Sequence, residues 1–313
     1  MIVHRNLDRC SLFKNTILTI GSFDGIHCGH QKILARMFEL AKSNYLETVL
    51  LSFEPHPKIA LAHLKNERAQ IKLLNSIDEK ISILEKMGLD HLVLVPFDKD
   101  FSLLSPEAYI ANFLCAHFHP KIIVIGYDHR FGFERNGSID DFIFYQKKYN
   151  YEVLEISKKE IDDISVSSTK IRKALEATEI DKANKFLGYP YLLSGEVVKG
   201  DQIGRTIGFP TANLQIDNPY KLIPPDGVYS CKVQINQNLH SGMLYIGNRP
   251  TLNLMQDKKI EVFLFDFNQQ IYGEHMVVEI HAFIRPDIKF ANLSELKIQL
   301  QEDEQIVRTN LTK

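Results

Sequence analysis

A chain of 313 residues is long enough for two domains of about 150 residues each. Its hydrophobic share of 44% and charged share of 24% are typical of a globular protein, and no apolar run reaches the roughly 18 residues of a membrane span. The net charge of −2, with acidic and basic residues interleaved, lacks the basic surface of a duplex-binding protein. We therefore expect neither a membrane nor a nucleic-acid partner.

The N-terminal residues and the cysteines indicate the compartment. Residues 1–15 contain no apolar stretch followed by a small-residue cleavage site, so we expect a cytoplasmic protein. No two cysteines have the short spacing of a zinc site or a redox dithiol, which favours reduced thiols at Cys10, Cys28, Cys115 and Cys231.

The segment from Thr16 to about Ile156 alternates between strand-like and helix-like runs. This alternation predicts an α/β, Rossmann-like domain whose parallel sheet binds ligands at the carboxyl ends of its strands. The expected strands are 16–21, 47–53, 91–97, 121–126 and 151–156, and the expected helices are 31–44, 76–88, 105–118 and 138–150.

The pattern changes after two further helical stretches, 167–177 and one that ends near Leu187. Short strands separated by glycine, proline and asparagine turns predict a small antiparallel β-barrel or sandwich. A closing C-terminal helix over 293–309, with Ser294 as its cap, completes the second domain. The predicted strands are 194–200, 227–235, 241–247, 259–267 and 275–284, and the predicted domains are 1–187 and 188–313.

A loop between the first strand and its helix predicts the first site. Glycines at 21, 25 and 29 let backbone approach a ligand, and the start of a helix attracts phosphate. His27 and His30, three residues apart, can point the same way and add donors or positive charge. Such a loop with two histidines could stabilise the negative charge that builds up on a phosphate when a nucleophile attacks it. Two isolated core or surface histidines, or a zinc pair with Cys28 or His56, are the alternatives, although the usual spacing of zinc ligands is absent.

A second anion anchor is predicted where the helix 167–177 begins. Ser167 or Ser168 can cap that helix, while Lys170 and Arg172 place positive charge in its first turns. Cations at this end oppose the helix dipole, and a bound anion would resolve the conflict.

The segment 200–213, GDQIGRTIGFPTAN, predicts a second phosphate loop. Gly200, Gly204 and Gly208 let backbone amides converge on an anion, and Arg205 adds a charged fork. The oxygens of Thr211 and Asn213 are of the hard type that Mg²⁺ prefers. Further along the chain, Glu261 could take a proton from a hydroxyl. The alternative interpretation is ordinary hairpin turns and a solvent-facing glutamate.

Four motifs in the first half, GxFDGxHxGH, FEPHP, GxDxRFG and SSTxIR, resemble the FAD synthetase part of bacterial bifunctional riboflavin kinase/FMN adenylyltransferases. The resemblance implies that His27 and His30 bind ATP phosphates and stabilise the transition state, while Ser168, Thr169 and Arg172 hold the triphosphate. His129 departs from the aromatic residue usual in the third motif. The remaining motif positions imply nucleotide contacts by Gly21, Phe23, Asp24, Gly25, Gly29, His56, Asp128 and Arg130.

The second half is similar to the riboflavin kinase signature GxxxGRxxGFPTAN, followed by GVY, IGxRPT, EVxLxDF, YG and RPxxKF. The resemblance implies that Thr211 and Asn213 bind Mg²⁺ and ATP, and that Glu261 is the general base on the ribityl 5′-hydroxyl. Asn248, Arg249 and Arg285 match motif positions, but no physical argument gives them a role. Nucleotide contacts are implied for Gly200, Gly204, Arg205, Gly208 and Pro210.

Three functions remain open from these motifs. The first is a bifunctional enzyme that phosphorylates riboflavin to FMN with ATP and Mg²⁺ and then adenylylates FMN to FAD, releasing pyrophosphate. The second is a nucleotidyltransferase for another phosphorylated acceptor, joined to a flavin-binding β module. The third is a flavin store that binds without turnover. We expect the small-molecule substrates ATP, riboflavin and FMN, and a monomer or weak homo-oligomer.

Overall fold

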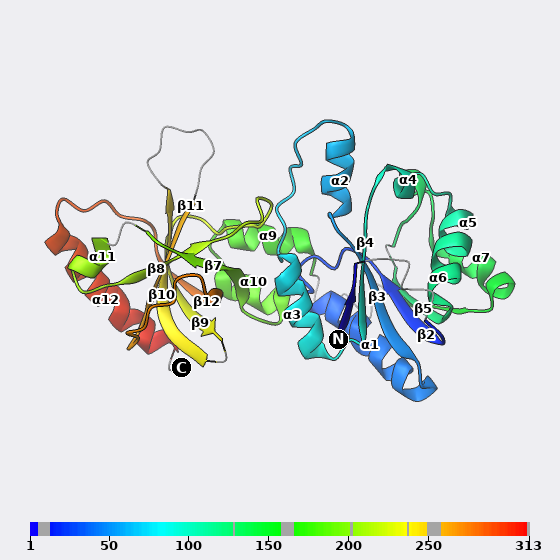
Figure 1. Cartoon of the computed structure of the whole chain (residues 1–313), viewed down its shortest axis with the longest axis horizontal. Coiled ribbons are helices and arrows are strands. Elements are labelled where there is room, and N and C mark those ends of the chain that lie inside the picture. The colour runs from blue at the N-terminus through cyan, green and yellow to red at the C-terminus, as the bar shows by residue number, and fades with distance from the viewer. Residues whose placement is uncertain are drawn as a thin grey trace. The chain divides into compact units, whose positions relative to one another are not determined.

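The computed structural model describes residues 1–5, 13–127, 129–157, 166–200, 203–236, 238–248 and 258–311, which Figure 1 draws as ribbon. The chain forms two compact units. The first comprises Met1–Ile71 and Lys80–Val166, and the second comprises Lys72–Glu79 and Ser167–Lys313. The domain limits 1–187 and 188–313 stay a prediction.

The first unit is built on a six-stranded parallel sheet of order β1-β4-β3-β2-β5-β6. From β2, the chain adds β3 and β4 on one side and then β5 and β6 on the other, so the strand order reverses at β2. Such a switch point is where open α/β sheets bind ligands. The strands are β1 (Ile2–His4), β2 (Thr16–Ile20), β3 (Glu47–Phe53), β4 (His91–Val95), β5 (Pro120–Gly126) and β6 (Glu152–Ile156).

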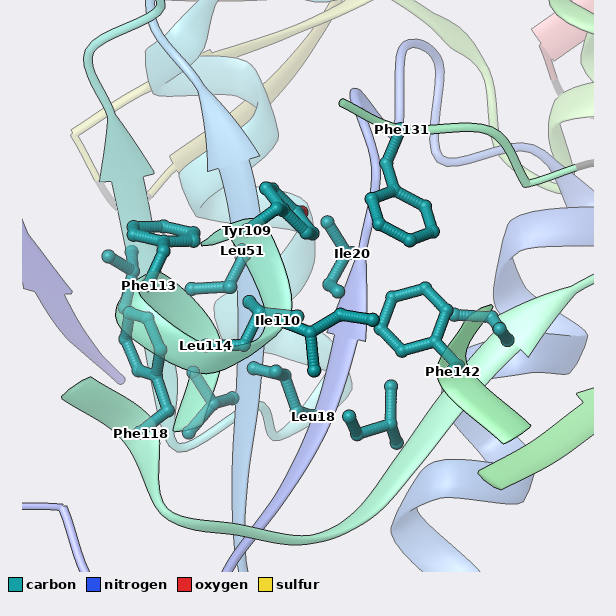
Figure 2. Packing of buried hydrophobic residues seen from close by; sticks show 14 of the residues in the cluster. Leu18, Ile20, Leu51, Tyr109, Ile110, Phe113, Leu114, Phe118, Phe131 and Phe142 are labelled. Atoms are coloured by element: carbon teal, nitrogen blue, oxygen red, sulfur yellow. The ribbon is translucent and has the colours of Figure 1, made fainter. Parts of the chain in front are cut away.

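Helices cover both faces of this sheet, as predicted. Helix α1 packs against β2, β3 and β5, and an aromatic-rich core fills the other face. Figure 2 shows Ile110 and Leu114 of a helical segment pointing toward Leu18 of β2. The helices up to residue 149 are α1 (Cys28–Asn44), α2 (Pro57–Leu64), α3 (Ile77–Met87), α4 (Lys99–Ser102), α5 (Pro106–Ala108), the π-helix η2 (Tyr109–Cys115), α6 (Ala116–Phe118), the 3₁₀ helix η3 (Phe133–Arg135) and α7 (Ile139–Tyr149).

The expected single helix over 105–118 is wrong in its detail, because the segment is divided into α5, η2 and α6. A π-helix bonds each residue to the fifth one along instead of the fourth. Its apolar side chains, Tyr109, Ile110, Phe113 and Leu114, all remain buried, so the sequence pattern resembles that of an ordinary helix.

The second unit contains a closed barrel of order β10-β11-β8-β7-β12-β9, which settles the choice between barrel and sandwich. All its strand pairs are antiparallel. Its elements are α9 (Ser168–Glu176), α10 (Ile180–Leu187), β7 (Tyr191–Val198), α11 (Ile203–Thr206), β8 (Thr211–Gln215), β9 (Gly227–Ile235), β10 (Asn238–Asn248), β11 (Lys258–Leu264), β12 (His275–Arg285) and α12 (Leu293–Leu311).

Helix α12 closes the chain and packs against β9, β10 and β12. The expected cap at Ser294 is wrong: Ser294 lies inside the helix, and the Asn292 side chain accepts a hydrogen bond from the Glu295 N–H at 3.0 Å. Asn is as good a cap as Ser, and the observed cap lies two residues before the one we predicted. Among the described residues, no helix combines the length and apolarity needed to cross a membrane.

Candidate active sites

The loop after β2 begins at the carboxyl end of the strand where the sheet order reverses. The Gly21 N–H donates to the Leu51 carbonyl of β3 at 3.0 Å, which ties the start of the loop to the sheet. Phe23 and Asp24 are buried, each about 4% exposed. Gly25 has a φ of 89°, a left-handed conformation that glycine adopts without strain.

His27 and His30 lie together at the end of this loop. His27 caps α1, and its Nδ1 accepts a hydrogen bond from the His30 N–H at 3.4 Å. The two imidazole rings stack with centroids 3.7 Å apart and planes 14° apart, and the His30 ring also lies 4.7 Å from that of Phe23. Gly29 lies between the histidines, buried in the first turn of α1. The structure therefore brings the two predicted histidines onto one side of the helix entrance.

The His30 ring combines burial with an unused hydrogen-bonding atom. Its Nδ1 is buried and has no hydrogen-bond partner in the described part of the chain. Burial, with smaller contributions from His27 and Lys80, holds the pKa of His30 well below its usual value. A buried polar atom without a partner costs free energy. A ligand oxygen would remove that cost by bonding to Nδ1 itself.

The zinc alternative gains no support from the geometry. Across the described ranges, no group of three or more histidine, cysteine, aspartate or glutamate side chains is arranged to hold a metal ion. His56 is instead the cap of α2, where its Nδ1 accepts a hydrogen bond from the Lys58 N–H at 3.1 Å. That contact gives His56 a structural role, and a nucleotide contact by His56 stays a prediction.

The GxDxRFG segment is described only in part. Asp128 lies outside the described residues, and Arg130 is exposed. The ring of His129, which departs from the family pattern, stacks on Phe131 with centroids 5.9 Å apart and lies 6.1 Å from Phe142. The imidazole therefore packs within a cluster of aromatic rings.

The second predicted anion anchor lies on α9, in the second unit. Ser167, not Ser168, is the cap, and its hydroxyl accepts a hydrogen bond from the Lys170 N–H at 3.3 Å. Arg172 donates from Nε to the Lys72 carbonyl at 2.6 Å. Triphosphate binding by Ser168, Thr169 and Arg172 stays a prediction.

Three side chains of neighbouring barrel strands form the second site. Asn213 of β8 is paired with Glu261 of β11 in the register of the sheet. The Thr211 hydroxyl lies 3.4 Å from one Glu261 carboxylate oxygen. The Asn213 Oδ1 is buried, and within the described ranges it has no hydrogen-bond partner. Because an amide oxygen, a hydroxyl and a carboxylate are hard ligands, this group suits Mg²⁺ with a phosphate.

The glycine-rich segment before β8 approaches Asn213 closely. A Cβ at Gly200 would lie 2.1 Å from Asn213 Nδ2, so no larger residue is accommodated without displacing that side chain. The described remainder of the segment continues through α11, where Arg205 is exposed, to Gly208 and Pro210, which are also exposed. This close approach explains why a glycine stands at the start of the motif.

A cavity of about 310 Å³ opens beside these side chains. Sequence reasoning did not identify Lys259, whose Nζ lies 3.1 Å from a Glu261 carboxylate oxygen. The period of two along a strand could have placed these two residues on one face. Arg285, which had no assigned role, lines the same cavity and is held by Asp303 of α12. Other lining residues are Gly204, Ile207, Phe209, Thr211, Val228, Met243, Tyr245, Phe263, Asp287, Ile288, Phe290, Leu296 and Leu300.

Two family models match different parts of the chain. The FAD synthetase model matches residues 11–170, which include His27 and His30. The riboflavin kinase model matches residues 187–311, which include Thr211, Asn213 and Glu261.

Whole-chain relatives agree with these matches. A bifunctional riboflavin kinase/FMN adenylyltransferase of Listeria monocytogenes is 38% identical over 96% of this chain and 93% of its own length. The protein of the same name from Buchnera aphidicola subsp. Acyrthosiphon pisum is 37% identical over 94% of this chain and 93% of its own length. A crystal structure described as a macrolide-efflux protein from Streptococcus pneumoniae has a TM-score of 0.83 and 32% identity, with 98% of both chains covered.

Proposed function

Since the chain belongs to the family of bifunctional riboflavin kinase/FMN adenylyltransferases, we propose that its two sites divide the two reactions between them. The site of His27 and His30 adenylylates FMN, and the site of Thr211, Asn213 and Glu261 phosphorylates riboflavin. The observation that carries this division is the match of two different family models to two parts of the chain, each of which contains one of the clusters.

Riboflavin phosphorylation needs a base, because its nucleophile is an alcohol. Glu261 takes the proton of the ribityl 5′-hydroxyl while that oxygen attacks the γ-phosphorus of ATP. The new oxygen–phosphorus bond forms as the bond to the β,γ-bridging oxygen breaks, and ADP leaves. The 3.1 Å contact with Lys259 orients the Glu261 carboxylate.

The oxygen ligands beside Glu261 fit a magnesium ion. Thr211 and Asn213 would hold it, and the buried Oδ1 of Asn213, which has no partner among the described residues, is the observation that supports the fit. When bound, the ion neutralises charge on the ATP phosphates. The two side chains then orient the nucleotide relative to the base.

FMN adenylylation needs no base, because its nucleophile is already an anion. A phosphate oxygen of FMN attacks the α-phosphorus of ATP, the bond to the α,β-bridging oxygen breaks, and pyrophosphate leaves. His27 and His30 donate hydrogen bonds to the phosphate oxygens, where negative charge increases. Without a ligand, burial above all, with His27 and Lys80 nearby, keeps the pKa of His30 low, so its ring is neutral. A bound phosphate favours the protonated form, which stabilises that charge.

Isotopic labelling tests whether the protein carries out both reactions. ATP labelled at the γ-phosphate should transfer its label to FMN when riboflavin is supplied, whereas ATP labelled at the α-phosphate should transfer its label to FAD when FMN is supplied. Transfer of the α-label to another supplied phosphomonoester, but not to FMN, would indicate a different phosphorylated acceptor. If neither label were transferred with Mg²⁺ present, the protein would be a flavin-binding protein without turnover. The cytoplasmic location and the monomeric or weakly associated state stay predictions.

A further inference from the structure

Lys80 of α3 has an unusual environment for a lysine, because it is buried to 7% exposure in the first unit. Its amine donates to the Ser22 carbonyl at 2.7 Å and to the Ser52 hydroxyl at 3.1 Å. Ser52, near the end of β3, donates from its own hydroxyl to the same carbonyl at 3.3 Å. Two donors on neighbouring elements therefore hold one carbonyl oxygen.

The carbonyl of Ser22 belongs to the loop that carries the histidines. Phe23, the next residue, has a φ of 43°, in the left-handed region that non-glycine residues rarely adopt. Such a conformation persists only where the surroundings fix it. The Phe23 carbonyl accepts from the Ile26 N–H at 3.3 Å, one residue before the His27 cap. The contact with Lys80 thus holds the loop directly before a residue in this conformation.

The Lys80 amine also brings a positive charge into the interior of the first unit. Among the described residues, the Lys80 amine has no carboxylate in ion-pair contact, although Asp24 of the loop and Glu54 after β3 are near enough to favour its charged form. The charge of Lys80 is in turn one cause of the low pKa of His30. A buried cation without a close counter-ion costs free energy. A polyanionic ligand bound nearby would offset this cost.

We propose that Lys80 is a positioning residue for adenylyl transfer: its charged amine holds the loop from Gly21 to His27 in its working conformation and adds positive charge behind the site of the ATP phosphates. The proposal rests on the assignment of adenylyl transfer to the two histidines. It requires the amine to be protonated, because only the ammonium form provides both the charge and a full set of donors.

The charge requirement gives the proposal a pH signature. Burial lowers the pKa of Lys80 to about 8, against the opposing effects of Asp24 and Glu54. The titratable groups near the amine are these two carboxylates and, from the start of α1, the neutral ring of His30. The amine therefore loses its proton as the pH rises through about 8. Because kcat/KM reports the free enzyme, kcat/KM for ATP in FAD formation should decline above this pH.

Two substitutions and a matched control test the proposal. FAD formation from FMN is measured between pH 6.5 and 9.5 for the wild type, Lys80→Arg, Lys80→Met and Lys86→Met. Lys86 lies on the same helix but is exposed, so its variant should retain the wild-type profile. Lys80→Met should lower kcat/KM for ATP about 10- to 100-fold at pH 7, the usual effect of losing hydrogen bonds from a charged group. Lys80→Arg should retain more activity than Lys80→Met. Its kcat/KM for ATP should not decline near pH 8, because guanidinium stays protonated.

The outcomes separate this proposal from the assignment of function. A wild-type kcat/KM that stays constant to pH 9.5, or a decline near pH 8 that remains in Lys80→Arg, would overturn the proposal while FAD is still formed. A wild-type protein that forms no FAD at all would instead contradict the proposed function. If Lys80→Met fails to fold, which thermal unfolding would show, the profiles of the wild type and Lys80→Arg still decide the question.

Discussion

The two sites of this chain differ in the side chains that we assign to the chemistry. The site after β2 (Thr16–Ile20) has nitrogen donors, the stacked rings of His27 and His30, with the buried amine of Lys80 near enough to affect His30. The barrel site has three oxygen-bearing side chains, Thr211, Asn213 and Glu261, and its cation Lys259 is paired with Glu261.

This difference follows from the two nucleophiles. A phosphate oxygen already carries the charge needed to attack phosphorus, so the first site only has to stabilise negative charge. An alcohol must lose a proton, so the second site also needs a base, and a carboxylate beside phosphates then needs a cation to offset the repulsion. The predictions below test whether the first site depends on charge stabilisation and the second on a base and a cation.

The largest effect is expected when the base is removed. Glu261→Gln keeps the shape of the side chain but cannot accept the proton, so the rate of FMN formation from riboflavin should fall about 10²- to 10⁴-fold. Chromatography of the flavins measures this rate. Glu196→Gln, on the exposed side of β7, is the control and should have no effect. Wild-type kinase activity in the Glu261→Gln protein would contradict the assignment of Glu261 as the general base.

The next effect concerns charge stabilisation at the first site. His27→Ala removes a ring nitrogen and the cap of α1, and the rate of FAD formation from FMN should fall about 10²- to 10³-fold, as when one donor to a developing negative charge is lost. His63→Ala, exposed in α2, provides the matched control. An equal loss of FAD formation in His27→Ala and His63→Ala would contradict the role assigned to His27.

A smaller effect is expected from the metal ligands. Asn213→Ala removes one of two protein oxygens, and the Mg²⁺ concentration needed for half-maximal kinase activity should rise about 10- to 100-fold. A titration with MgCl₂ measures the shift. FAD formation should show no comparable shift, and Gln215→Ala, exposed on the same strand, should leave both titrations unchanged. An unchanged kinase titration would contradict the assignment of Asn213.

Arg285 sharpens the description of the barrel site. Asp303, fully buried, holds the guanidinium through Nε at 2.9 Å and Nη2 at 2.7 Å. Asp303→Asn should loosen this pair and raise the KM for riboflavin about 10-fold, the effect of one charged hydrogen bond at its weaker limit. Asp266→Asn breaks an exposed pair of the same helix, with Arg308, and should leave the KM unchanged. Equal KM values in both variants would show that Arg285 does not contact the substrate.

The smallest effect is a dependence of stability on pH at the first site. Because the pKa of His30 is lowered by burial, the unfolded chain binds a proton near pH 6.5 that the folded chain does not. Its contribution to stability is therefore present above pH 6.5 and is lost as the pH falls toward the folded pKa, by at most about 1.4 kcal/mol per pH unit. Urea unfolding of the wild type and His30→Ala at pH 8 and pH 5.5 measures the difference. If the two proteins respond equally to pH, His30 is not neutral in the fold.

Much of the fold could be predicted because the chain alternates its elements regularly. The apolar strands β2 and β5 were found from their composition, and the glycine-rich loop before β8 was found from its residue types. Strand β1 (Ile2–His4) was missed because three residues are too few for a pattern. The π-helix was missed because its apolar side chains repeat almost as they do in an α-helix.

The candidate sites were predictable only where a residue type is unusual in its element. Paired histidines at a helix entrance have that property, whereas Lys80 and Lys259 do not, because a charged residue in an amphipathic element is normally solvent-facing. Burial of Lys80 depends on contacts with Ser22 and Ser52, far along the chain. Such contacts arise only from the tertiary fold.

One measurement tests the central claim of separate chemistry most directly. Riboflavin, FMN and FAD are separated over time after riboflavin or FMN is mixed with ATP and Mg²⁺ and the wild type, His30→Ala or Glu261→Gln. We expect His30→Ala to accumulate FMN without FAD, and Glu261→Gln to form FAD from FMN but almost no FMN from riboflavin. Loss of both activities in either folded variant would contradict the claim.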